Sequence, residues 1–148
     1  AEKTDDIVVV EGELDALSAT AAGIPSVVAM GGSHISGDRK KQIEDAFNRG
    51  VTRIYLSPDL DTMADADTGE EVPNYAKRHE AVMRSVHTIK DVNFEFDNIF
   101  VVRFPSPADP DSFIRENGVE AFLRLLQSAV PYWKYDAEYH EDMLPKNK

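Results

Sequence analysis

The sequence predicts an α/β fold: a mostly parallel sheet of about four strands flanked by helices. Short aliphatic or β-branched runs alternate with segments in which apolar residues recur three or four positions apart. Strands and helices that alternate in this way form parallel sheets with right-handed crossovers. The 148 residues, of which 42% are hydrophobic, suit one domain with a single core.

The first elements are a strand, a helix and a second strand. Residues 7–10 (IVVV) form a continuous apolar run, which is typical of a strand buried on both faces. Leu14, Leu17 and Ala21 follow at helical spacing, and the Gly-Ile-Pro sequence at 23–25 ends that helix. Residues 26–30 are predicted to form the second strand.

The middle of the chain continues the alternation. Asp38 is the predicted N-cap of a second helix, whose apolar stripe contains Ile43, Ala46 and Phe47. Residues 53–57 (RIYLS) form the third predicted strand. The polar stretch 62–73, punctuated by Gly and Pro, is predicted to be a mobile loop.

The last third of the chain contains one more strand and three more helices. A third helix is marked by Tyr75, His79, Val82 and Val86. A loop over roughly 90–98 leads to a strand at 99–102, then to a short helix at 112–117 and a final helix at 119–126. We assign residues 1–131 to one domain and 132–148 to a tail that packs Trp133 on the domain or begins another segment.

Composition limits the possible chemistry. The absence of cysteine excludes disulfides, thiolate zinc sites and cysteine nucleophiles, so metals must bind oxygen or histidine. The net charge of −11 argues against a protein that binds nucleic acid through its own basic surface, although bound Mg²⁺ would invert the local potential. With neither a membrane-length apolar stretch nor a signal-peptide pattern, the cytoplasm is the expected location.

Two acidic motifs directly follow predicted strands. Glu11 stands at the end of the first strand and Asp15 one helical turn later, in the motif EGELD. Asp59 and Asp61 follow the third strand as DLD, a spacing that suits two carboxylates sharing a hard cation. In parallel sheets functional groups collect beyond the carboxyl ends of strands, so we expect these carboxylates to meet there. Helix capping and turn formation are the alternative roles.

Two further charged groups could complete such a site. Asp109 and Asp111 follow the fourth strand and could extend the carboxylate ring, or Asp111 could cap the next helix. Arg39, Lys40 and Lys41 open the second helix as a compact basic patch. This patch could contact phosphate or form an ordinary solvated surface.

Together these motifs resemble the Toprim domain of DnaG-type bacterial and phage primases. The resemblance rests on VVVEGELDALSATAAGIPSVVAMGGS, the DLD motif, and PADPDSFIRENGVEAFLRLLQSAVP, and it spans about residues 7–131. Toprim domains are Rossmann-like folds that bind Mg²⁺ or Mn²⁺ and transfer phosphoryl or nucleotidyl groups on nucleic acid. The resemblance implies that Glu11 is an acid/base or a metal ligand, and that the following are metal ligands: Asp15, Asp59, Asp61, Asp109 and Asp111.

The implied function is synthesis of RNA primers during DNA replication. Its partners would be a single-stranded DNA template, nucleoside triphosphates and, through other domains, a replicative helicase. The polar insertion over 62–98 departs from the usual family pattern after DxD. We expect this chain to bind metal but to make little or no primer alone. Nuclease or topoisomerase-type cleavage by a Toprim site, or a receiver-like Mg²⁺-binding domain phosphorylated on Asp59, are the alternatives.

Overall fold

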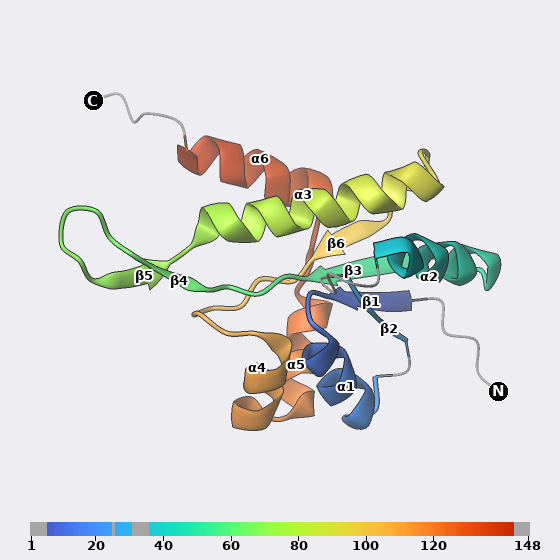
Figure 1. Cartoon of the computed structure of the whole chain (residues 1–148), viewed down its shortest axis with the longest axis horizontal. Helices are drawn as coiled ribbons and strands as arrows, with labels where there is room; N and C mark the ends of the chain where they lie inside the picture. The colour runs from blue at the N-terminus through green and yellow to red at the C-terminus, as the bar shows by residue number, and fades with distance from the viewer. Residues whose placement is uncertain (1–5, 25, 31–35, 144–148) are drawn as a thin grey trace.

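The computed structural model describes residues 6–24, 26–30 and 36–143, and the side chains of residues 40–142 within the last range (Figure 1). In this part of the chain the main sheet has five strands in the order β2-β1-β3-β6-β7. Four are parallel, and the short β7 pairs antiparallel with β6 at one edge. The bounds are β1 Asp6–Val10, β2 Val27–Ala29, β3 Arg53–Ser57, β6 Ile99–Val101 and β7 Val130–Pro131. The predicted α/β class is confirmed.

Helices cover both faces of this sheet (Figure 1). One layer contains α2 (Ser36–Asn48), α3 (Tyr75–Val92) and α6 (Tyr132–Met143), and the other contains α1 (Glu13–Ala21), α4 (Pro110–Asn117) and α5 (Val119–Gln127). Successive residues of β1 serve the two layers, since Ile7 and Val9 pack in the first core and Val8 and Val10 in the second. Burial on both sides explains the continuous apolar run of this strand. None of the described helices is both long and apolar enough to cross a membrane.

The helical spacing of Leu14, Leu17 and Ala21 does not mark the buried face of α1. Leu14 and Leu17 are 64% and 67% exposed, whereas Asp15 and Ala19 are buried. Ala19 has no side chain beyond Cβ, which permits α1 to approach the second core closely. The buried carboxylate of Asp15 accepts a hydrogen bond from the neighbouring α4 segment, which offsets part of its desolvation. A polar tertiary contact, rather than the leucine spacing, sets the rotation of this helix.

The predicted loop over 62–73 contains a two-stranded antiparallel hairpin, β4 (Thr62–Ala64) and β5 (Glu71–Pro73). It projects from the body of the molecule in Figure 1. Its turn is held by Asp65, whose Oδ1 accepts hydrogen bonds from the N–H groups of Asp67 and Thr68. Gly69 closes the turn at a φ of +74°, which suits glycine. Three-residue strands are too short to give an alternating pattern in the sequence.

Two predicted helix boundaries also shift. Helix α2 begins at Ser36, so Asp38 lies inside the helix rather than at its N-cap. Helix α3 continues to Val92, and the following loop therefore begins at residue 93 rather than 90. In α3 the N-cap is Asn74, whose side chain accepts a hydrogen bond from the Lys77 N–H.

The C-terminal segment contains structure that the sequence did not predict. Residues 130–131 form the edge strand β7 and residues 132–143 form α6. Trp133, predicted to pack on the domain, is 69% exposed, whereas Tyr135 is buried in the core shared with α3. Helical rotation explains the difference, because positions two residues apart on a helix point in different directions.

Candidate active site

Three strands deliver acidic residues to one edge of the sheet. The β1–β3 pairing places Val10 opposite Ser57, so Glu11 and Asp59 follow two neighbouring strands at the same end. The chain after β6 returns to this edge, where Leu60 and Ala108 pair through two 2.9 Å backbone hydrogen bonds. This bridge places the residue after Ala108, Asp109, beside the DLD motif. The predicted gathering of carboxylates at the edge is therefore present.

Glu11 joins the first two motifs directly. Its Oε2 accepts a 2.7 Å hydrogen bond from the backbone N–H of Asp59. Gly12 follows, and a Cβ atom there would lie 3.1 Å from Oδ2 of Asp15. This close approach favours glycine at position 12. In the EGELD motif, Glu11 therefore contacts the segment that follows β3, and Gly12 leaves room for the Asp15 carboxylate.

Asp15 lies buried between α1 and α4. Its Oδ1 accepts a 3.0 Å hydrogen bond from the backbone N–H of Asp111. Burial raises the pKa of this carboxyl, the Asp111 N–H opposes that rise, and the charge of Asp109 adds to it. The residue is positioned by the α4 segment, 96 positions away in the sequence.

Asp59 is the most perturbed acid of the group. Burial is the largest cause that raises its pKa to about 8, and the charge of Glu11 is the second. Three other acidic neighbours add to the rise: Asp15, Asp109 and Asp61. Its Oδ1 is buried and has no hydrogen-bond partner among the described residues. A buried carboxylate oxygen without a donor is costly unless a cation compensates it.

Asp61 sits at the more open side of the cluster. Its Oδ2 lies 2.7 Å from Nζ of Lys77, and both side chains are partly exposed. The α3 N-terminus is fixed here because the N–H of Asn74 donates to the Asp61 carbonyl oxygen at 2.7 Å. Lys77 was not predicted from the sequence, because the intervening hairpin hides its proximity to DLD.

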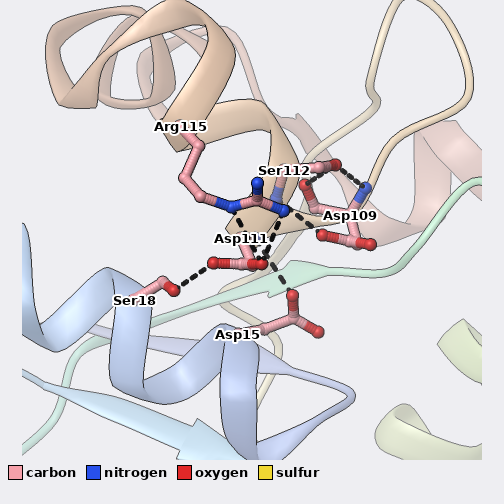
Figure 2. A network of polar contacts seen from close by, with 6 residues as sticks. All are labelled: Asp15, Ser18, Asp109, Asp111, Ser112 and Arg115. Carbon is pink, nitrogen blue, oxygen red and sulfur yellow. Dashed lines mark hydrogen bonds and ion pairs between the residues drawn. The ribbon is translucent and has the colours of Figure 1, made fainter.

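Asp109 and Asp111 have different roles (Figure 2). Asp109, not Asp111, caps α4: its Oδ1 accepts from the N–H of Ser112, whose hydroxyl accepts from the Asp109 N–H. The Asp111 carboxylate instead accepts a hydrogen bond from the Ser18 hydroxyl and forms an ion pair with Arg115 at 3.0 Å. These two contacts lower its pKa. The capping alternative therefore applies to the first residue of the pair.

The Asp111 contacts brace α4 against α1, as the dashed lines of Figure 2 show. Ser18 lies one turn after Asp15 on the same face of α1, and this spacing was the available signal for its participation. Asp111 as a metal ligand stays a prediction, since its carboxylate is engaged by Ser18 and Arg115 while its backbone positions Asp15.

The basic patch is only partly described. Lys40 forms an ion pair of 2.8 Å with Asp91 on α3, and Lys41 is exposed. The side chain of Arg39 lies outside the described residues. Phosphate contact by this patch stays a prediction.

The donor set fits a hard divalent cation. The cluster offers carboxylate oxygens, which Mg²⁺ and Mn²⁺ prefer, together with the partnerless Oδ1 of Asp59. In the described part of the chain, no three of these carboxylates bring ligand atoms within 4.8 Å of one another. Such an open arrangement suits Mg²⁺, which usually binds one or two carboxylates and completes its shell with water and substrate phosphate.

The chain is similar to a known protein family and to a known bacterial protein over most of its length. The family model described as Toprim-like matches residues 8–96. The chain is 31% identical over 131 residues to the DNA primase of Clostridium acetobutylicum, covering 88% of this chain and 18% of that protein. It therefore spans less than a fifth of the length of this curated relative.

Two solved structures resemble the fold. A DNA primase domain from Pseudomonas aeruginosa matches with a TM-score of 0.64 and 25% identity, covering 93% of this chain and 37% of that one. A DnaG primase catalytic domain bound to single-stranded DNA matches with a TM-score of 0.58 and 22% identity, covering 87% and 36%. At this identity the second likeness shows the fold alone.

Proposed function

Because the chain belongs to the Toprim-like family and resembles the Toprim part of DnaG-type primases, we propose that it performs the metal-dependent nucleotidyl transfer of a DNA primase. The reaction would join the primer 3′-oxygen to the α-phosphorus of a ribonucleoside triphosphate, with pyrophosphate as the leaving group, on a single-stranded DNA template during replication. The primase relative and the primase domain of known structure both support this choice among Toprim chemistries.

One observation carries the proposal: the environment of Asp59. Its pKa is raised to about 8 by burial and by the neighbouring acids, and one of its oxygens is buried without a donor among the described residues. Neither helix capping nor a turn accounts for this oxygen, because a carboxylate oxygen in either role accepts from an N–H. A site that holds a divalent cation explains it, because a cation neutralises the repulsion.

The residues that would hold Mg²⁺ or Mn²⁺ are those of the edge: Glu11, Asp15, Asp59, Asp61 and Asp109. When bound, such ions supply charge neutralisation at the triphosphate and favour ionisation of the attacking hydroxyl. Glu11 uses one carboxylate oxygen to hold the Asp59 backbone, and in the proposal the other accepts the proton of the primer 3′-hydroxyl. Lys77 binds one oxygen of the Asp61 carboxylate and would compete with the ion for it.

The proposed substrates are a primed single-stranded template and nucleoside triphosphates, with a replicative helicase as a partner of other domains. The chain carries a net charge of −11, so its attraction for nucleic acid must come from bound cations and local basic groups. Arg39, Lys40 and Lys41 are proposed to contact phosphate near the start of α2.

The first experiment is a Mn²⁺ titration of this chain, followed by the paramagnetic relaxation of water. We expect saturable binding that is at least tenfold weaker in Glu11→Gln and Asp59→Asn. Asp97→Asn removes an exposed acid away from the site and serves as the control for net charge. Equal binding by all four proteins would contradict the metal site.

The second experiment measures catalysis in a chimera in which this chain replaces the matching segment of the Clostridium acetobutylicum primase. We expect template-directed ribonucleotide incorporation that Glu11→Gln and Asp59→Asn each reduce by at least 100-fold, whereas Asp97→Asn retains it. A chimera that binds Mn²⁺ and cleaves the DNA template instead of extending a primer would replace the primase proposal by a nuclease function.

A further inference from the structure

A second group of possible metal ligands lies between α3 and α6, in the helix layer that these two helices share with α2. His79 comes from α3, and Asp136 and His140 come from successive turns of α6. One ligand atom from each of these three residues lies within 4.8 Å of the other two. The cluster shares no residue with the acidic edge of the sheet and lies on helices α3 and α6. This cluster is therefore separate from the proposed active site.

The distances inside the cluster are longer than a hydrogen bond, and one of them matches the spacing of two ligands on a tetrahedral ion. Oδ1 of Asp136 lies 3.3 Å from Nδ1 of His140 and 3.7 Å from Nε2 of His79. An N–H···O hydrogen bond spans about 2.7 to 3.2 Å. Two ligands of one tetrahedral ion, each about 2.0 to 2.1 Å from it, lie about 3.3 Å apart.

The central oxygen lacks an ordinary partner. Oδ1 of Asp136 is buried and has no hydrogen-bond partner among the described residues, and the His79 nitrogen nearest to it is Nε2. A buried carboxylate oxygen flanked by two imidazoles at slightly more than hydrogen-bond distance is the arrangement expected around an ion. Without an ion, this oxygen would be desolvated without compensation.

The surrounding packing holds the ligands in place. The ring of Tyr139 stacks on His79 with centroids 3.8 Å apart and an interplanar angle of 3°. Asp136 and His140 are four residues apart on α6, a spacing that places both side chains on one helix face. Nδ1 of His140 also contacts the Asp136 carbonyl oxygen at 2.8 Å, and the ring is 65% exposed. Because the ring is largely exposed, an ion can reach it from solvent, and binding through Nδ1 would replace the contact with the carbonyl oxygen.

We propose that His79, Asp136 and His140 bind one Zn²⁺ or a similar borderline divalent ion, which ties α6 to α3. Imidazole nitrogen favours Zn²⁺, Co²⁺ and Ni²⁺, whereas the all-oxygen edge of the sheet favours Mg²⁺ and Mn²⁺. Three protein ligands leave the fourth position of a tetrahedral Zn²⁺ to water. Since the site combines two helices, the ion binds the folded chain and stabilises it.

The test is a Co²⁺ titration of this chain, read by the visible absorption of tetrahedral Co²⁺, followed by displacement with Zn²⁺. We expect the visible bands to saturate at one equivalent of tetrahedral Co²⁺ and to disappear when Zn²⁺ replaces it. The midpoint of thermal unfolding should rise with Zn²⁺ and fall when a chelator is added. His140→Gln alters an exposed side chain, so the fold is retained, and it should weaken Co²⁺ binding at least tenfold. Asp136→Asn should do the same.

Two control variants make the result specific. His87→Gln removes an exposed histidine of α3 outside the cluster, and Asp59→Asn disrupts only the acidic edge. Both should keep the Co²⁺ spectrum of the unchanged chain. The proposal is overturned if the unchanged chain shows no tetrahedral Co²⁺ bands, or if His140→Gln and His87→Gln weaken binding equally. Because Asp59→Asn tests the active site separately, failure here leaves the proposed function standing.

Discussion

Replacing Asp59 by asparagine should stabilise the metal-free chain at alkaline pH while weakening its metal binding. In the folded chain, burial first and the charge of Glu11 second raise the Asp59 pKa from 3.8 to about 8. A folded-state pKa above the unfolded value means that the stabilising contribution of this group is complete below pH 3.8. It is lost as pH rises through about 8. An asparagine side chain at this position cannot ionise and does not incur this loss.

The magnitude follows from the pKa difference. Ionising Asp59 in the folded state costs at most about 6 kcal/mol relative to the unfolded chain. Partial exposure to water screens this cost, and we expect ionisation of Asp59 to lower the free energy of unfolding by about 2 kcal/mol. The two proteins should therefore have similar free energies of unfolding at about pH 4, and Asp59→Asn should be more stable by about 2 kcal/mol at about pH 9.

The assay is urea unfolding in a chelating buffer at several pH values between about 4 and 9, with Asp97→Asn as the control for removing a charge. Addition of Mn²⁺ at about pH 8 should then stabilise the unchanged chain more than Asp59→Asn, because a bound cation keeps Asp59 ionised. Unfolding free energies that run parallel for the unchanged chain and Asp59→Asn across the whole range would refute the electrostatic reasoning.

Three other substitutions test individual contacts. Lys77→Met removes the cation 2.7 Å from Asp61. Mn²⁺ binding should become a few-fold stronger at low salt, because Lys77 competes with the ion for that carboxylate. Calorimetry would check this, and weaker binding would contradict it. Ser112→Ala removes half of the α4 capping box and should lower the unfolding free energy by about 1 kcal/mol in urea. Phe122→Ala empties a fully buried position and should cost about 3 to 5 kcal/mol, whereas Leu123→Ala, which is partly exposed, should cost much less in the same assay.

Several features were predictable because they depend on residues close in the sequence. The strand at 7–10 is buried on both faces and therefore reads as a continuous apolar run, as does most of 53–57. Glu11 and Asp59 each follow such a strand, and parallel pairing brings strand ends to one edge. Topology rules alone therefore predicted that these acids would meet.

Other features depend on contacts that no local pattern encodes. The leucines of α1 lie outward because the Asp15 carboxylate is fixed by a backbone N–H of α4. The hairpin over 62–73 has strands of three residues, and its turn depends on the Asp65 side chain. The cluster of His79, Asp136 and His140 combines one i, i+4 pair on α6 with a histidine of α3 more than fifty positions earlier, and no local pattern joins that histidine to the pair.

The amino-acid sequence by itself determined the layered α/β class and the set of acidic residues at the strand ends, because hydrophobic periodicity and parallel pairing are local and general rules. Only the tertiary structure decided that Asp109 caps α4, that the Asp111 carboxylate braces Ser18 and Arg115, and that Asp59 is the acid most displaced in pKa. The physical reason is that a carboxylate's role depends on its burial and on the donors and charges around it. Those neighbours come from elements up to a hundred residues apart.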